Sequence, residues 1–320
     1  MMKYHKPWRV LVLCLLAAVL MLPVPARAVD SPDGSREVSL RITCKDRLVP
    51  LTGMEFHMYL VASRTDSGEL KVTDSFARYP VEIPGSDASW KSLAFTLEGY
   101  VLRDGVSPVD TAQADEEGIA SFPSRGKKLA QGLYLVVGSR HIRNGERYDP
   151  APFLILLPGL DTDGESWIYD AAVKVKYDTS FVPENPEATV QRSVLKSWQD
   201  AGHEEKRPEE VVVDLLRNGV IYDTVVLNSG NNWRYSWTGL SDRYTWRVVE
   251  KETSGYTVSV TQEGLTFVIT NTYDANPPGG PDQNLPQTGQ LWWPVPVLTC
   301  AGLLMVVVGL VRRREGEYEA

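Results

Sequence analysis

Apolar and polar positions alternate through residues 189–274, and this alternation predicts short β-strands. Turn-forming Asn-Gly, Ser-Gly and Glu-Gly pairs separate the runs. The runs are TVQRSVLKSW, EEVVVDLLRNG, VIYDTVVLNSG, NNWRYSWTGL, RYTWRVVEKE, YTVSVTQEG and LTFVITNTYD. Six or seven strands at this spacing predict an antiparallel, immunoglobulin-like β-sandwich.

Three of these runs place a polar residue on the face that should enter the core. On the last run, Asn271 shares a face with Phe267 and Ile269. Lys196 on the first run and Glu250 on the fifth are aligned in the same way with apolar neighbours, which are Val194, Trp198, Trp246 and Val248. A buried polar group without a partner costs roughly 1–3 kcal/mol. Three such groups in one core therefore suggest a shared purpose.

Residues 35–178 mix predicted strands with one predicted helix. Runs such as SLRITC, MEFHMYLVAS and GLYLVVG are typical of strands. Between them, apolar residues recur every three or four positions, which predicts an amphipathic helix. These positions are Trp90, Leu93, Ala94, Leu97 and Val101.

Proline-rich segments within residues 179–188 and 275–284 predict a linker and an extended spacer. We therefore expect an all-β chain with two immunoglobulin-like β-sandwich domains in tandem. The first spans 35–178 and carries a short helical insertion, and the second spans 189–274.

The N-terminal residues have the order expected of a secretory signal peptide. Three basic residues (Lys3, Lys6 and Arg9) precede a long apolar run, and Ala-Arg-Ala occupies positions 26–28. We therefore expect residues 1–28 to be removed by cleavage after Ala28. The alternative is an uncleaved N-terminal anchor.

The C-terminal residues combine an apolar run with a short motif. Residues 291–311 are long and apolar enough for a transmembrane helix, and the basic tail at 312–320 should stay in the cytoplasm. Directly before them, LPQTG at 285–289 resembles the sorting signal of Gram-positive cell-wall proteins. The alternative is an ordinary single-pass membrane protein, which leaves this motif unexplained.

The resemblance to a sorting signal implies that a sortase recognises the motif and cuts between Thr288 and Gly289. Thr288 is then joined to a peptidoglycan precursor or to another pilin subunit. The motif residues that the resemblance assigns to this reaction are Leu285, Pro286, Thr288 and Gly289.

Removal of both ends leaves an acidic extracellular chain, residues 29–288. Its formal charge is -12, because the full chain carries -8, residues 1–28 carry four bases and no acid, and residues 289–320 carry three of each sign. Nucleic acids are therefore poor partners.

Cys44 is the lone cysteine of this part, which excludes an intramolecular disulfide. The histidines lack metal-ligand spacing and no catalytic motif is present, so we expect no metal, no cofactor and no wall-anchored hydrolase.

The second domain has a family resemblance. Its runs KSW, RPEEVVVDLLRNG, VVLNSGNNWRYSWTGL, YTWRVVE, GYTV and ITNTY resemble, in this order, a Cna B-type domain of Gram-positive surface proteins and pilins. Domains of this family form a spontaneous isopeptide bond. The resemblance implies Lys196 as the nucleophile, Asn271 as the acceptor and Glu250 as the assisting acid. An apolar site favours the neutral amine and the neutral acid that this chemistry requires. The alternative is a hydrogen-bonded cluster of the three residues without a covalent bond.

The first domain resembles an N-terminal pilin domain of the SpaA type, through LTGMEFHMYLVAS and the strands that follow. It departs from the isopeptide pattern at each key place. Cys44 occupies the expected lysine face, Gly138 the position of the acid, and the last strand offers Asp170 and no asparagine. We therefore expect no isopeptide bond here and a buried, apolar role for Cys44. The alternative, a thioester-forming cysteine, lacks its surrounding motif.

A lysine near the end of the first domain is a candidate polymerisation site. Shaft pilins carry a motif WxxxVxVYPK, whose lysine pilin sortases join to the next subunit. Aligned on Trp167, this chain reads WIYDAAVKVK, which puts Lys176 at the lysine position without the Tyr-Pro pair before it. The alternative is a solvated lysine at a strand end.

Together these features predict a sortase-anchored, extracellular protein of the Gram-positive cell wall, retained in the membrane only before sorting. We expect a structural or adhesive role, as a pilin subunit or wall-attached stalk, with no enzymatic turnover beyond the single autocatalytic bond. The alternative is a stand-alone adhesin whose N-terminal domain binds a host protein or glycan.

Overall fold

The computed structural model describes residues 31–273 except 66, 84–86, 165, 183–184, 186 and 252–254. The expected signal peptide with its cleavage site at Ala28, the spacer, the sorting signal and the apolar span all lie outside the described residues. In the described part of the chain, no helix is long and apolar enough to cross a membrane.

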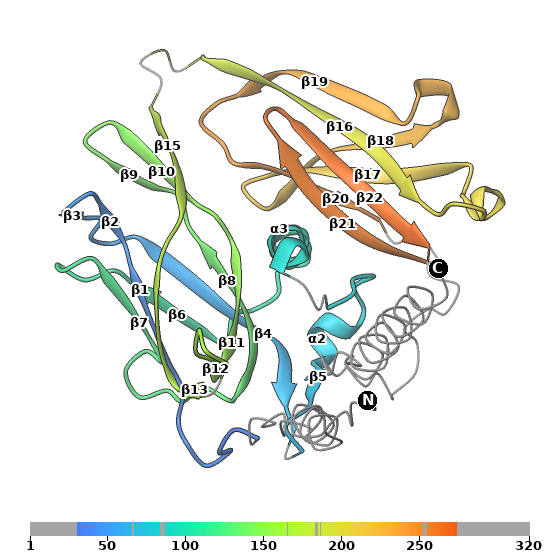
Figure 1. Cartoon of the computed structure of the whole chain (residues 1–320). Coiled ribbons are helices and arrows are strands. Elements are labelled where there is room, and N and C mark those ends of the chain that lie inside the picture. The colour runs from blue at the N-terminus through green and yellow to red at the C-terminus, as the bar shows by residue number, and fades with distance from the viewer. Residues whose placement is uncertain are drawn as a thin grey trace, which may run out of the picture. The chain divides into compact units, whose positions relative to one another are not determined.

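The chain is built mostly from β-strands, which form two β-sandwich domains in tandem, as the sequence predicted (Figure 1). Each sheet takes all of its strands from one domain. We refer to β1–β15 with their helices as the N-terminal domain and to β16–β22 as the C-terminal domain. The last strand of the N-terminal domain, β15 (Tyr177–Phe181), extends into the segment expected to be a linker.

Three main sheets build the N-terminal domain. The first has the order β14 (Asp170–Lys174), β1 (Ser39–Thr43), β7 (Ile119–Phe122), with β1 parallel to β14. The second has the order β11 (Phe153–Leu157), β8 (Gly132–Gly138), β4 (Glu55–Arg64), β5 (Leu70–Val72), with β6 (Asp110–Gln113) also paired to β4. The third has the order β15, β10 (Glu146–Pro150), β9 (His141–Arg143). Two short pairs complete the set: β2 (Lys45–Asp46) with β3 (Val49–Pro50), and β12 (Gly159–Leu160) with β13 (Trp167–Ile168).

The predicted helix is present as α3 (Asp87–Arg103), after a single turn, α2 (Asp74–Ala77). The apolar positions Leu93, Ala94 and Leu97 are buried and share a cluster with β8 residues of the second sheet. The helix is covered away from this apolar side too, because Phe95 packs against the core of the C-terminal domain and Thr96 and Glu98 are only 2% and 3% exposed. The helix is therefore covered on both sides, whereas an amphipathic pattern predicts one exposed face.

Two facing sheets build the C-terminal domain. One has the order β19 (Arg234–Ser241), β16 (Thr189–Gln199), β22 (Thr266–Tyr273), β21 (Tyr256–Glu263), and the other β18 (Val220–Asn228), β17 (Glu210–Arg217), β20 (Trp246–Glu250). All seven runs predicted from the sequence are strands. Their apolar side chains, including the buried Trp237, form one core.

The expectation of an antiparallel sandwich is wrong at one place, because the first and last strands of the C-terminal domain, β16 and β22, run parallel. The alternating pattern identifies each run as a strand. The direction of its neighbour depends on how the connections cross between the sheets, which the pattern does not record. The parallel pairing brings the two ends of the domain side by side.

Candidate cross-linking site

The structure brings the three predicted residues together in the core of the C-terminal domain. Lys196 on β16 is 4% exposed, and Glu250 on β20 and Asn271 on β22 are both 0% exposed. Lys196 and Asn271 belong to neighbouring strands of one sheet, whereas Glu250 reaches them from the facing sheet. This placement confirms that all three side chains point inward.

The carboxyl group of Glu250 contacts both of the other residues. Its Oε1 accepts a hydrogen bond from Asn271 Nδ2 at 2.6 Å, and its Oε2 lies 3.6 Å from Lys196 Nζ. Lys196 Nζ also donates to the Ser197 carbonyl oxygen at 3.0 Å. The amine and the amide therefore meet at a single carboxyl group.

Burial changes the protonation of the lysine. Removal from water lowers the pKa of Lys196 to about 8, although the neighbouring Glu250 carboxylate favours the charged amine. A lysine in this range releases its proton far more readily than one at the surface, which is what a nucleophilic amine requires.

The amide of Asn271 is suited to act as the acceptor. Its Oδ1 is buried, and no residue in the described part of the chain gives it a hydrogen bond. Amide oxygen and nitrogen exchange places when the group rotates by half a turn. After that rotation, the amide oxygen would face Glu250 Oε1, where a carboxylic acid could donate a hydrogen bond that polarises the carbonyl.

A second group of side chains closes the site on the side of the lysine. The ring centroid of Trp198 lies 4.1 Å from Lys196 Nζ. Beyond it, Asp200 is 4% exposed, and its carboxylate accepts two hydrogen bonds from Arg207, at 2.7 and 2.6 Å, and one from Tyr256 at 3.1 Å. The Arg207 guanidinium lowers the pKa of Asp200, so this carboxylate stays charged. Asp200 and Arg207 were not predicted from the sequence, where only their spacing of seven residues across a turn could have suggested the pair.

In the N-terminal domain, the described residues Cys44, Gly138 and Asp170, at the positions expected for a lysine, an acid and an asparagine, do not form a comparable cluster. Cys44 is 0% exposed within the apolar core, and burial raises the pKa of its thiol to about 12. Gly138 ends β8, and a Cβ there would lie 2.6 Å from Pro150, so no acid fits. Asp170 is exposed on β14 and accepts a hydrogen bond from Ser39. These placements agree with the predicted apolar role of Cys44.

Of the other predicted site residues, Lys176 lies in the N-terminal domain, apart from this site. Lys176 is exposed between β14 and β15, and its backbone carbonyl accepts a hydrogen bond from Ala151 N. The sortase motif residues and Ala28 lie outside the described residues. Within the described ranges, no group of His, Cys, Asp and Glu could hold a metal ion.

Comparison with known proteins bears on the C-terminal domain. Residues 192–272 match the family model of the Cna protein B-type domain. A 98-residue segment is 32% identical to the collagen adhesin of Staphylococcus aureus; it covers 28% of this chain and 8% of the adhesin. The chain thus spans a small part of that relative's length.

Two solved structures show similarity over most of the chain. One is a single B repeat unit of the collagen-binding surface protein of Staphylococcus aureus, which is 19% identical in sequence. The match covers 74% of this chain and 98% of that chain, with a TM-score of 0.26. The other is the full-length major pilin SpaD of Corynebacterium diphtheriae, which is 15% identical in sequence. The match covers 75% of this chain and 65% of the pilin chain, with a TM-score of 0.31. The family match confirms the resemblance that the sequence predicted: over residues 192–272, this chain carries a Cna B-type domain.

Proposed function

We propose that this chain is a structural protein of the Gram-positive cell surface, stiffened by an isopeptide bond between Lys196 and Asn271. The observation that carries the proposal is the buried Glu250 carboxyl, which contacts both the amine and the amide. The match of residues 192–272 to the Cna B-type domain supports it independently. The surface location is supported by the LPQTG motif at 285–289 and by the acidic character of the exported chain.

The proposed reaction needs only groups that the site contains. In the reactive state Lys196 is a neutral amine and Glu250 a neutral acid. Lys196 Nζ attacks Asn271 Cγ while Glu250 donates a hydrogen bond to Oδ1. The new Nζ–Cγ bond replaces the Cγ–Nδ2 bond. Nζ gives up one proton, Glu250 passes it to Nδ2, and Nδ2 leaves as ammonia. Folding supplies the proximity, so no external enzyme takes part.

The product has a mechanical consequence. Lys196 lies on the first strand of the domain and Asn271 on the last, and these strands are direct neighbours. A bond between them passes tension from one end of the domain to the other without loading the five strands between. This property suits a protein tethered to a wall at one end.

Intact-mass measurement of residues 29–288 under denaturing conditions tests the bond. We expect a mass lower than the calculated one by one ammonia molecule, and a tryptic product that joins the Lys196 peptide to the Asn271 peptide. Lys196→Ala and Asn271→Ala should each restore the calculated mass for the variant.

Lys176→Ala is the matched control, because it removes an exposed lysine from the other domain. It should keep the ammonia loss. A wild-type mass equal to the calculated one would show that the three residues form a non-covalent cluster and would overturn the proposed bond.

A further inference from the structure

Helix α3 of the N-terminal domain lies against β20 and β21 of the C-terminal domain (Figure 1). Its buried Glu98 pairs with Arg247 of β20. Arg247 Nε donates to Glu98 Oε2 at 2.7 Å, and Nη2 donates to Oε1 at 3.3 Å. A two-pronged contact of this kind fixes the orientation of both groups. Its burial also makes separation costly, because each charge would lose its partner.

The helix also reaches the open edge of a sheet. β21 is an edge strand, so its outward N–H groups face no neighbouring strand. Two of them have partners in the N-terminal domain instead: Val258 N donates to Pro80 O at 2.6 Å, and Val260 N donates to Thr96 Oγ1 at 2.8 Å. The N-terminal domain thus supplies acceptors at the positions where a further strand would supply them.

Apolar packing joins the same surfaces. Leu216 and Val249 of the C-terminal domain, 0% and 2% exposed, belong to one cluster with the apolar residues of α3. The closest approach is at Gly99, where a Cβ would lie 2.9 Å from Val249 Cγ2 and 3.3 Å from the Val248 carbonyl oxygen. The absence of a side chain at position 99 therefore allows the helix to approach β20 this closely.

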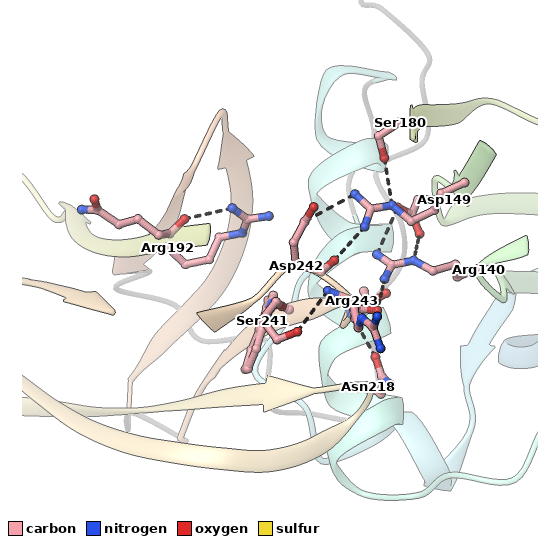
Figure 2. Close-up of polar contacts among 12 residues, drawn as sticks. Arg140, Asp149, Ser180, Arg192, Asn218, Ser241, Asp242 and Arg243 are labelled. Atoms are coloured by element: carbon pink, nitrogen blue, oxygen red, sulfur yellow. Dashed lines mark hydrogen bonds and ion pairs between the residues drawn. The ribbon is translucent and has the colours of Figure 1, made fainter. Parts of the chain in front are cut away.

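A second contact joins the domains through Arg140 and Arg147 rather than through α3 (Figure 2). Arg147 donates to the Asp242 carbonyl oxygen at 2.7 Å, and Arg140 donates to the Arg243 carbonyl oxygen at 2.7 Å. Asp149 holds Arg140 in place through hydrogen bonds at 2.5 and 3.1 Å. Two separate contacts restrict rotation between the domains more than one contact does.

Domains joined by a small polar interface usually move relative to one another. Here the contacts comprise a buried ion pair, a shared apolar cluster and hydrogen bonds to a sheet edge. We infer that the two domains form one rigid unit, in which α3 and the Pro80 carbonyl close the edge of β21. The surface of α3 is an interaction surface whose partner is the C-terminal domain of the same chain. A strand from another chain cannot add at this edge while the helix is docked.

Amide hydrogen exchange of residues 29–288, followed by NMR, tests the inference. The amides of Val258 and Val260 point out of the sheet edge and depend on the N-terminal domain for protection. In the wild type we expect both to exchange about a thousandfold or more slower than in an unfolded peptide. Exchange near the unprotected rate would mean that the edge is open and would overturn the inference.

Gly99→Leu should separate the surfaces, and Gly34→Leu is its matched control, because no atom lies within 4 Å of a Cβ at position 34. We expect at least about tenfold faster exchange at Val258 and Val260 in Gly99→Leu alone, with the β17–β18 amides unchanged as evidence of a folded domain. Arg247→Met should act in the same direction from the other side of the interface. Unchanged exchange at both amides in both variants would contradict the inference.

Because the measurement does not involve Lys196 or the mass of the chain, its outcome is independent of the isopeptide bond.

Discussion

Lys196 and Asn271 lie on adjacent parallel strands, in a register that pairs Lys196 with Ile269 and Asn271 with Trp198. Both side chains therefore emerge on the core face, two positions apart along the strand direction, an offset of about 6–7 Å. A lysine side chain is long enough to cover that offset, and Glu250 meets it from the facing sheet. The register thus determines which residue on the last strand the amine can reach.

The first prediction concerns stability. Asn271→Ala should lower the free energy of unfolding of the C-terminal domain by about 4 kcal/mol through loss of the proposed cross-link, and by about 1 kcal/mol more because the buried Glu250 carboxyl loses the amide group as a partner. Urea unfolding followed by tryptophan fluorescence measures the combined loss. Thr272→Ala, on the opposite face of the same strand, is the control and should change stability by less than about 1 kcal/mol. Equal stabilities of the two variants would contradict a cross-link.

The second prediction concerns pH. In the proposed reaction, Lys196 and Glu250 together hold one proton, and the amine attacks when that proton is on the acid. The pKa of Lys196 is about 8, so raising the pH above this value removes the shared proton. The rate of ammonia release after refolding should therefore level off below pH 8 and fall above it, by about tenfold per pH unit. Time-resolved intact mass after refolding measures it. A rate that rises through pH 8 would show that a neutral amine alone suffices.

The inward placement of Lys196, Glu250 and Asn271 could be predicted because the strand period reports which face a residue occupies. The helical period did not predict the burial of Thr96 and Glu98, because it shows only that they lie outside the apolar stripe. Their burial depends on a partner domain: Glu98 meets Arg247, 149 positions later in the chain. Contacts at that separation follow from the tertiary arrangement, which also determines the parallel pairing of the first and last strands.

The third prediction concerns Asp200. Asp200→Asn removes the charge that holds Arg207 and receives the Tyr256 hydroxyl. We expect a loss of about 1–3 kcal/mol in the free energy of unfolding, because the carboxylate is buried and the guanidinium is only partly exposed. The proposed cross-linking should also be slower, because Arg207 packs on the Trp198 ring that contacts Lys196. Glu205→Gln alters an exposed acid nearby and should change neither stability nor rate.

The fourth prediction concerns Cys44. Its thiol is buried, with a pKa raised to about 12, so a thiol-alkylating reagent should not label the folded chain 29–288 at neutral pH. Labelling should become complete in denaturant, as mass spectrometry can show. Ser121→Cys places a second thiol at an exposed position on β7 and should add one label in the folded state. Rapid labelling of Cys44 in the folded wild type would exclude its apolar role.

The last prediction separates a pilin subunit from a stand-alone adhesin. Lys176 is exposed between two strands, as attack on a sortase acyl-enzyme requires, and Lys174, two residues before it, is also exposed. If Lys176 joins subunits, cell-wall extracts boiled in detergent should show a ladder of high-mass bands that Lys176→Ala abolishes and Lys174→Ala preserves. Both variants should keep the ammonia loss expected of the proposed Lys196–Asn271 bond, which intact mass checks on the secreted chain. A single band in the wild type would instead favour the stand-alone form, with the N-terminal domain free to bind a host ligand.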